Sequence, residues 1–442
     1  NNCIDNIPQM DMYTKGTDQQ KAQLKRMYGE ALALRAQFYL EAIRNWGDLP
    51  AHFTSAKNLA VTNPFPKATD RDSLYEVLLS DLKTASDLVP WRKDVTTIGD
   101  QADERLTKGA IKGLRARIAL YRAGYSLRKN GQMQQGANAN TYYQIALQET
   151  KEIIASGQHG LNPSFKALWR DQVCAHASQD PDGELMFQAS ATGRTGVGDT
   201  KLGYYNGPTV GTYGNKSINV LPSYFYTFDS TDTRRDVTCA VYNVNADGAT
   251  KSGQAITAIN DGKYRRDWVT NPAILPTDAI QYLSLKWQIL RYSDVLLMFA
   301  EAENQINGPT AAAYDAVNQV RRRGYGKAIG TANATVDLPA GLSQSAFFTA
   351  LVKERSLELG GEGIRKYDLI RWNLLASTIA NTKTTLTAMS NRTGTWANLP
   401  QSMYFKTNST ADDKTAWATS FHVKEPTTAP AGTTKVTWMG ST

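Results

Sequence analysis

The sequence predicts a predominantly α-helical protein that carries one loop-rich, partly β region. In two long parts of the chain, residues 1–156 and 285–380, apolar residues recur at the three- and four-residue steps of amphipathic helices. Residues 157–284 lack this period and are rich in Gly, Thr, Tyr and Asn. Residues 381–442 are also poor in apolar periodicity, so we expect a loop-dominated segment that packs over the helices.

Composition excludes several classes of function. Of the 442 residues, 41% are hydrophobic and 20% are charged, as in an ordinary globular protein. The net charge of +8 comes from Lys and Arg spread along the whole chain, so we predict no nucleic-acid partner. The three cysteines are far apart and the four histidines are scattered, so we expect no disulfide framework, no metal site and no cofactor.

The ends of the chain also carry information. No apolar run is long enough to span a bilayer, and the chain opens at Asn1 without an export signal. The opening NNCIDNIP is typical of the end of a helix that runs into Pro8. We therefore expect the chain to be a piece of a longer protein.

The long helices have recognisable beginnings and ends. Thr17 can cap a helix that runs to Trp46 and stops in the turn Gly-Asp-Leu-Pro. Its expected apolar stripe consists of Leu24, Met27, Ala31, Phe38 and Ala42. Further helices are expected at 73–89, 107–127, 141–155, 290–306, 311–323, 345–359 and 365–372. Consecutive helices with short polar connections indicate stacked pairs, as in a tetratricopeptide-like α-α superhelix.

Charged residues occupy positions where these helices should be apolar. Arg35 and Arg355 each fall in an apolar face, and Glu358 lies one turn beyond Arg355. Asp294 and Glu301 share one face of the 290–306 helix, and we expect them to pair the guanidinium groups of Arg35 and Arg355. Structural ion pairs are one interpretation of this pattern, and general acid–base machinery is the other.

The middle region combines a long loop with short strands. The run GRTGVGDTKLGYYNGPTVGTYGN, residues 193–215, has no apolar period and is expected to be a loop. Within 221–236, Asp232 and Arg234 are expected to form a structural cap and pair. Short strands are expected at 184–189, 238–244 and 264–269.

The tyrosines of this loop suggest a ligand surface. Pyranose rings pack their C–H face on an aromatic ring, while their hydroxyl groups bond to amides and charged groups. We therefore expect a binding site with the residues Tyr204, Tyr205, Asn206, Tyr213 and, more remotely, Trp268. The alternative is that each of these side chains serves only in packing.

Several segments resemble the SusD/RagB family of nutrient-binding surface lipoproteins. They are LRAQFYLEAIRNWGDLP, LPSYFYTFDSTDTRRD, RYSDVLLMFAEAENQI followed by AVNQVRRRGYG, and ERSLELGGEGIRKYDLIRW. The resemblance implies a protein on the outer surface of a Gram-negative cell, held by a lipid anchor that this chain lacks. It also implies that the protein captures oligosaccharide or another nutrient, without cleaving it, for a SusC-like TonB-dependent transporter in the outer membrane.

Two other functions remain open from the sequence. A helical-repeat scaffold that binds only protein would share the stacked helices but would not need the tyrosine-rich loop. A glycoside hydrolase would need two carboxylates across a sugar, a geometry that sequence spacing does not reveal. The chain contains no GxSxG, HExxH, phosphate-loop or dinucleotide-binding motif.

Overall fold

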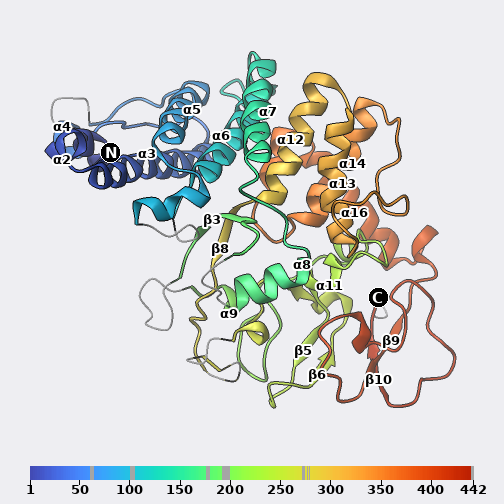
Figure 1. The fold of residues 1–442 in the computed structure, drawn as a ribbon. Coiled ribbons are helices and arrows are strands. Elements are labelled where there is room, and N and C mark those ends of the chain that lie inside the picture. The colour runs from blue at the N-terminus through green and yellow to red at the C-terminus, as the bar shows by residue number, and fades with distance from the viewer. Residues whose placement is uncertain are drawn as a thin grey trace.

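The chain folds into a helical half and a loop-rich half that contains most of the short strands (Figure 1). The computed structural model describes residues 1–59, 64–99, 105–175, 180–191, 200–270, 274–275, 277 and 279–439. In Figure 1 the blue to cyan and the orange helices make up the upper half, and green, yellow and red segments make up the lower half. The predominantly α-helical class is as predicted.

The helical half is a row of long helices that pack against their neighbours in sequence. They are α3 (Asp18–Trp46), α5 (Arg71–Leu88), α6 (Lys108–Ala123), α7 (Ala139–Ala155), α12 (Tyr292–Asn307), α13 (Ala311–Gly324), α14 (Gln344–Glu358) and α16 (Leu375–Ser390). Helix α3 contacts α5, α5 contacts α6, α6 contacts α7, and α7 contacts α12, which contacts α13 and α14. Residues 156–291 lie between α7 and α12 in the sequence, yet these two helices pack together. One continuous layer of helices is therefore built from segments on both sides of this insertion.

Shorter helices connect these elements. The α-helical ones are α1 (Asn2–Asn6), α2 (Asp11–Lys15), α4 (Ala56–Leu59), α8 (Phe165–Ala167), α9 (Leu202–Tyr205), α10 (Pro222–Phe225), α11 (Arg234–Thr238) and α15 (Arg365–Arg371). A π-helical segment, η3 (Leu168–Cys174), continues α8. Single 3₁₀ segments are η1 (Ile7–Gln9), η2 (Arg92–Ile98), η4 (Ile256–Ala258), η5 (Arg266–Trp268), η6 (Gly394–Trp396) and η7 (Lys414–Ala416).

The strands of the described residues pair two by two and antiparallel. The pairs are β1 (Tyr125–Leu127) with β2 (Met133–Gln135), β3 (Leu185–Ala189) with β8 (Trp287–Arg291), β4 (Cys239–Ala240) with β7 (Asn260–Asp261), β5 (Tyr242–Val244) with β6 (Lys251–Gly253), and β9 (Ser402–Lys406) with β10 (Thr433–Thr437). The strands predicted at 184–189 and 238–244 are confirmed. The strand predicted at 264–269 is wrong, because that segment contains the 3₁₀ turn η5.

Side-chain caps explain where several helices begin. The Thr17 hydroxyl accepts from the Gln20 amide, and the Gln20 side chain accepts from the Thr17 amide, which makes a complete capping box. Helices α6, α13 and α14 begin in the same way, behind side-chain caps from Thr107, Thr310 and Ser343. These hydroxyl groups satisfy backbone N–H groups that have no partner inside the helix.

The buried face of α3 differs from the predicted stripe. Leu32, Leu40 and Ile43 are buried with small residues between them, whereas Met27 is 43% and Phe38 is 69% exposed. Small residues decide the orientation, because they let α5 approach closely. At Gly29, for example, an added Cβ would lie 2.5 Å from a methyl carbon of Val89. The predicted stripe therefore faces outward.

The predicted helices differ from the structure at two further places. The helix predicted at 107–127 ends at Ala123, and β1 follows it. Helix α16 was not among the expected helices, and it runs ten residues into the expected loop-dominated tail before it ends at Ser390. Past this helix, the tail forms the β9–β10 pair and joins an aromatic core with Phe225, Trp417, Phe421 and Trp438.

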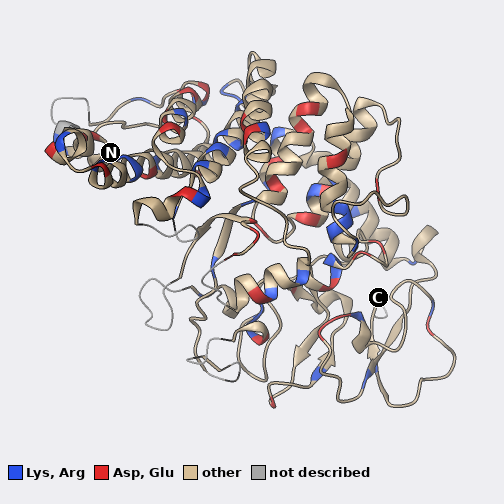
Figure 2. Ribbon diagram, viewed as in Figure 1, with Lys and Arg blue, Asp and Glu red and all other residues tan. Residues whose placement is uncertain are grey.

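Ion pairs fill the centre of the molecule, where Figure 2 shows acidic and basic residues interleaved along the middle helices. The larger ion cluster contains five cations and five carboxylates: Arg234, Lys263, Arg291, Arg321 and Arg323 with Glu184, Asp232, Glu354, Glu358 and Glu362. Its charges balance, so each buried charge has a compensating partner. The predicted pair of Asp232 and Arg234 is confirmed, at 2.7 Å.

The smaller ion cluster joins α6, α12, α14 and α15. Asp294 accepts from Arg117 at 2.5 Å and from Arg355 at 2.6 Å, and Asp368 lies 2.8 Å from Arg355. Arg371 completes the cluster by binding both Asp368 and Glu301. Burial alone would raise the pKa of the Asp294 carboxyl, but the two guanidinium groups outweigh it and hold the pKa below its ordinary value.

The predicted ion partners are therefore partly right. Arg355 is buried and paired with Asp294, as expected. Arg35 is half-buried and binds Asp81 of α5 through two hydrogen bonds of 2.8 and 2.9 Å, so its predicted pairing with Asp294 or Glu301 is wrong. Glu358 lies in the larger cluster, where burial would raise its pKa but Arg323, Arg291 and Arg234 lower it.

Candidate functional site

The predicted tyrosine pair lies on a short helix at the surface. Tyr204 and Tyr205 end α9, their rings meet edge to face at 5.0 Å, and Tyr205 is 43% exposed. The chain then turns back on this helix, because the Asn215 amide donates to the Tyr204 carbonyl at 2.7 Å and the Ser217 amide donates to the Tyr205 carbonyl at 2.8 Å. The turn presents an aromatic ring beside polar side chains.

Asn206 and Tyr213 support this surface. The Asn206 amide group donates to the Leu202 carbonyl at 3.0 Å and so closes the end of α9. Tyr213 is half-buried, with its ring 5.8 Å from the Arg266 guanidinium carbon. Of the predicted 193–215 loop, residues 193–199 lie outside the described residues, and the described remainder contains α9 rather than loop alone.

Trp268 lies in the interior. It is 5% exposed, its indole N–H donates to Asp412 at 2.9 Å, and the Arg265 guanidinium stacks on its ring at 4.1 Å. A side chain enclosed in this way has no face left for a sugar ring. In this structure Trp268 therefore packs the core beneath the loop and does not join the other four predicted site residues at the surface.

An open hollow lies between the lower ends of the helical half and the aromatic core. Its volume is about 680 Å³. Five segments line it: residues 221–227 around α10, 356–361 at the end of α14, 365–369 of α15, 378–385 of α16, and Trp396 of η6. None of the lining residues, which include Tyr224, Tyr226, Ser356, Arg365 and Thr382, was predicted as part of a site, because they come from these separate segments.

One wall of the hollow is aromatic and fixed in place. The Tyr226 ring lies 5.8 Å from the Trp396 ring, and the Tyr226 hydroxyl donates to the Phe421 carbonyl at 3.0 Å. Tyr224 donates to the Ser356 carbonyl at 2.7 Å, and burial raises the pKa of its phenol well above the ordinary value. Both hydroxyl groups are anchored, so the rings keep one orientation toward the hollow.

The opposite wall is a polar face of α16. Thr378, Asn381, Thr382 and Thr385 all line the hollow. Their spacing of three, one and three residues places them on one side of the helix. Helix α16 has one buried residue, Met389, and leaves this row of hydroxyl and amide groups toward the hollow.

A surface strip connects the tyrosine pair with this hollow. Ser217, whose amide binds the Tyr205 carbonyl, is followed by Ile218, which is 49% exposed. Leu221 is 52% exposed and lines the hollow itself. Four residues of extended chain span roughly 13 Å, so the two surfaces are close enough to belong to one extended binding site.

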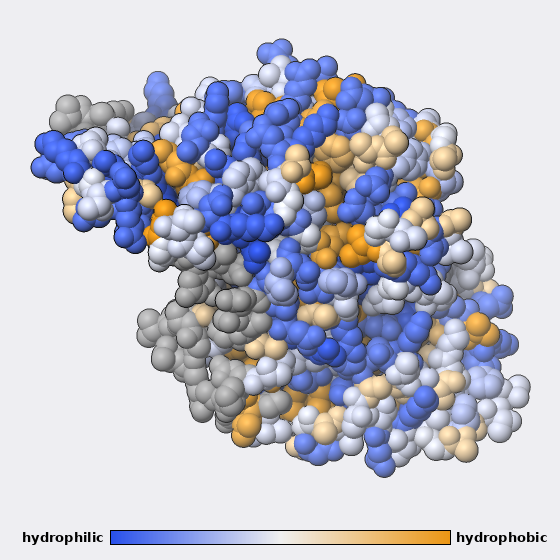
Figure 3. All heavy atoms as spheres, viewed as in Figure 1, coloured by the Kyte–Doolittle hydropathy of each residue, from blue (hydrophilic) through white to orange (hydrophobic). Residues whose placement is uncertain are grey.

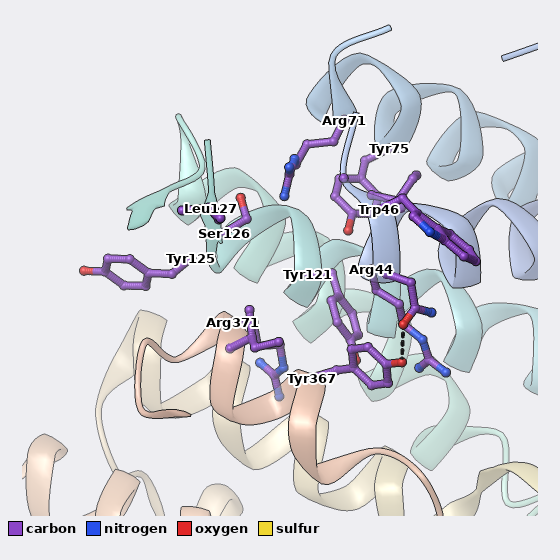
Figure 4. Close-up of a pocket in the computed structure, with 14 residues that line it drawn as sticks. Arg44, Trp46, Arg71, Tyr75, Tyr121, Tyr125, Ser126, Leu127, Tyr367 and Arg371 are labelled. Carbon is purple, nitrogen blue, oxygen red and sulfur yellow. Dashed lines mark hydrogen bonds between the residues drawn. The ribbon is translucent and has the colours of Figure 1, made fainter. Parts of the chain in front are cut away.

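A second hollow of about 210 Å³ lies where α3 ends against β1 and α15 (Figure 4). Its polar groups already bind one another: the Tyr367 hydroxyl donates to Asn45 at 2.8 Å, and the Arg44 guanidinium lies 4.0 Å from the Tyr367 ring. Arg71, which also lines it, binds Asp48. This hollow is a gap between packed helices, and few of its polar side chains remain available to bind a ligand.

The described residues show no sign of a metal site or a membrane-spanning helix. Within the described ranges, no three His, Cys, Asp or Glu residues are placed to hold a metal ion. None of the described helices has the length and apolar character needed to cross a membrane. On the face drawn in Figure 3, hydrophilic side chains predominate and apolar side chains form small separate patches.

The comparisons with known proteins agree on one family. The sequence model of the SusD family matches residues 223–427. A SusD-like protein of Formosa agariphila is 23% identical over 403 residues, which cover 86% of this chain and 68% of that relative.

Solved structures share the fold. A SusD homolog from Bacteroides thetaiotaomicron has a TM-score of 0.73 and 27% identity, and covers 87% of this chain and 75% of its own. Surface glycan-binding protein A from the same organism, solved in complex with laminarihexaose, has a TM-score of 0.59 and 21% identity, and covers 85% of this chain and 74% of its own. The matching family model, the curated relative and the solved homolog all show that this chain is similar to proteins of the SusD family.

Proposed function

We propose that this protein captures oligosaccharide at the cell surface and delivers it to a SusC-like, TonB-dependent transporter. Similarity to the SusD family supports the proposal, and a protein of the same fold was solved with laminarihexaose bound. The observation that carries it within this chain is the exposed Tyr205 ring, held beside polar groups by the turn that follows α9. An aromatic face next to hydrogen-bonding groups is the chemistry that a pyranose ring requires.

The proposed ligand surface consists of Tyr204, Tyr205, Asn206 and Tyr213. Tyr205 provides the stacking face, and Tyr204 holds it by an edge-to-face contact at 5.0 Å. Asn206 fixes the end of α9, and Tyr213 completes the turn. Trp268 supports the surface from below through its bond to Asp412.

The protein is proposed to act by binding and not by catalysis. The strongest carboxylate groupings of the described residues, in the two ion clusters, are neutralised by guanidinium groups. A pair of carboxylates that cleaves a glycosidic bond must face a sugar instead. Paired and buried carboxylates are suited to holding helices together.

The proposed location is the outer surface of a Gram-negative cell, with attachment through a lipid anchor. The transporter is proposed to contact the outward stripe of α3. Met27, Leu34 and Phe38 are 43%, 40% and 69% exposed, and their spacing of seven and four residues places them on one side of the helix. An apolar stripe on an otherwise polar helix is typical of a protein-binding face.

Isothermal titration with laminarihexaose and a panel of soluble oligosaccharides tests the proposal. Tyr205→Ala should weaken binding of the recognised glycan roughly tenfold, because one aromatic stacking contact is lost. Phe38→Ala removes an exposed ring on α3 and should leave glycan affinity unchanged, while weakening capture of the transporter by the purified protein. Equal melting temperatures for both variants would exclude unfolding as the cause.

Each alternative makes a different prediction in the same experiment. A scaffold that binds only protein would bind none of the glycans. A glycoside hydrolase would shorten the oligosaccharide during the titration, as chromatography of the mixture would reveal. Either result would overturn the proposed function.

A further inference from the structure

The hollow between α10, α15 and α16 contains a positive charge with little compensation. Arg365, the first residue of α15, lines this hollow and is half-buried. Its Nη1 donates to the Val352 carbonyl at 2.9 Å. In the part of the chain that the structure describes, its guanidinium makes no ion pair with a carboxylate.

The other buried arginines nearby, in contrast to Arg365, are paired with carboxylates. Arg355 binds two carboxylates, those of Asp294 and Asp368, and Arg371 binds Asp368 and Glu301. Burial lowers the pKa of the Arg365 guanidinium, and Asp368, already bound to two arginines, only partly opposes the effect. An arginine that keeps its charge under such conditions has donors available for an anion.

The surroundings of Arg365 suit a sugar ring. Tyr226 and Trp396 offer aromatic faces held 5.8 Å apart, and the row from Thr378 to Thr385 offers hydroxyl and amide groups. The wall of the hollow is closely packed, because a Cβ on Gly360 would lie 1.8 Å from the Tyr224 hydroxyl oxygen. Stacking faces, hydroxyl partners and one cation therefore line the same hollow of about 680 Å³.

We propose that this hollow binds an anionic sugar unit of the captured glycan, with Arg365 as the partner of its negative group. The negative group is a uronic acid carboxylate or a sulfate ester, both of which accept two hydrogen bonds from one guanidinium. The Trp396 ring stacks against the sugar, and the α16 row binds its hydroxyl groups. This assignment rests on the proposed glycan-binding function and adds the charge class of the ligand.

Calorimetry with three matched oligosaccharides tests the assignment: oligogalacturonate, a sulfated carrageenan oligosaccharide and neutral laminarihexaose. At least one anionic oligosaccharide should bind more tightly than the neutral one, and its affinity should fall as salt increases. Arg365→Gln keeps a donor for the Val352 carbonyl and removes the charge, and should weaken anionic binding roughly ten- to a hundredfold.

Two controls separate charge from shape. Lys383→Gln removes one positive charge from an exposed site on α16 that does not line the hollow, and should leave the affinity unchanged. Trp396→Ala should weaken binding without changing its salt dependence. Binding of oligogalacturonate would identify the negative group as a carboxylate, and binding of the carrageenan oligosaccharide would identify it as a sulfate ester.

The outcomes also separate this assignment from the function on which it rests. If laminarihexaose binds as tightly as both anionic oligosaccharides, or if Arg365→Gln binds them as the wild type does, the assignment is wrong and glycan capture stands. If no oligosaccharide of any charge binds the folded protein, both are wrong.

Discussion

Arg291 and Glu362 form a two-point ion pair inside the protein: Nε donates to Oε2 and Nη2 donates to Oε1, each at 2.8 Å. The pair joins the end of β8 to the turn that follows α14. Both side chains are almost completely buried, and Lys263 also binds Glu362 at 2.6 Å. The contact ties the loop-rich half of the chain to the helical half through charge.

Removing one member of this pair should strongly destabilise the protein. Glu362→Gln removes the carboxylate that pairs the buried Lys263 and one of the three carboxylates that pair Arg291, and should lower the free energy of unfolding by roughly 3–5 kcal/mol. Urea denaturation followed by circular dichroism measures the change. Asp11→Asn, which removes an exposed ion pair with Lys15, should leave the denaturation midpoint unchanged. Equal effects of the two substitutions would contradict the importance of burial.

A second prediction concerns pH. Burial raises the pKa of Asp261 from 3.8 to about 6, although Lys263 and Arg265 oppose the shift. Between these two pH values the folded protein keeps a proton that the unfolded chain has released, so stability falls as the pH rises through this window. Asp261→Asn should remove that loss, and its advantage over the wild type should grow by about 3 kcal/mol between pH 4 and pH 7.

Unfolding measured at several pH values checks this prediction. Asp294 and Glu358 act in the opposite sense, because their folded-state pKa values lie below the ordinary ones. Their contribution is present above about pH 4 and is lost on further acidification, in both the wild type and the Asn variant. A constant difference between the two proteins from pH 4 to pH 7 would show that the pKa of Asp261 is not raised in the folded protein.

Gly360 should not accept a side chain. A Cβ at this position would lie 1.8 Å from the Tyr224 hydroxyl oxygen, so Gly360→Ala must displace the ring and break its bond to the Ser356 carbonyl. We expect a loss of roughly 1–3 kcal/mol in the free energy of unfolding. Tyr224→Phe removes the oxygen, so the double variant should lose less than the sum of the two single losses. Additive losses would mean that the clash is relieved elsewhere.

The cap of α3 gives a local prediction. Thr17→Ala removes the hydroxyl that accepts from the Gln20 amide, and should cost about 1 kcal/mol. Thr17→Ser retains the oxygen and should cost little. Hydrogen exchange should quicken in the first turn of α3 in the Ala variant alone, and equal exchange in both variants would contradict the capping role.

Local signals predicted much of the fold. Caps and apolar periods located seven of the eight long helices of the described residues to within a few residues, because both depend on neighbours in sequence, and they missed α16. Arg355 was identified as buried because a charge in an apolar face must be neutralised, and Asp294 lies one helix away to do so.

The errors in the predictions arise from contacts between segments that are distant in the sequence. Arg35 binds Asp81, and nothing along α5 distinguishes that aspartate from its neighbours. Phe38 lies outside because the small residues on the other side of α3 allow closer packing with α5. The hollow was not predicted, since its walls come from five segments and no helix was expected where α16 places the polar row.

The aromatic core of the lower half also has a consequence for how the chain folds. The Trp438 indole donates to the Tyr226 hydroxyl at 2.8 Å across a separation of 212 residues, and Trp438 is fully buried. Contacts so distant in sequence form late, because a long stretch of chain must first be ordered between them. Within the two parts α3–α7 and α12–α14, the helical row can assemble from neighbouring segments. The aromatic wall of the hollow, by contrast, is expected to acquire its final shape only in the last stage of folding.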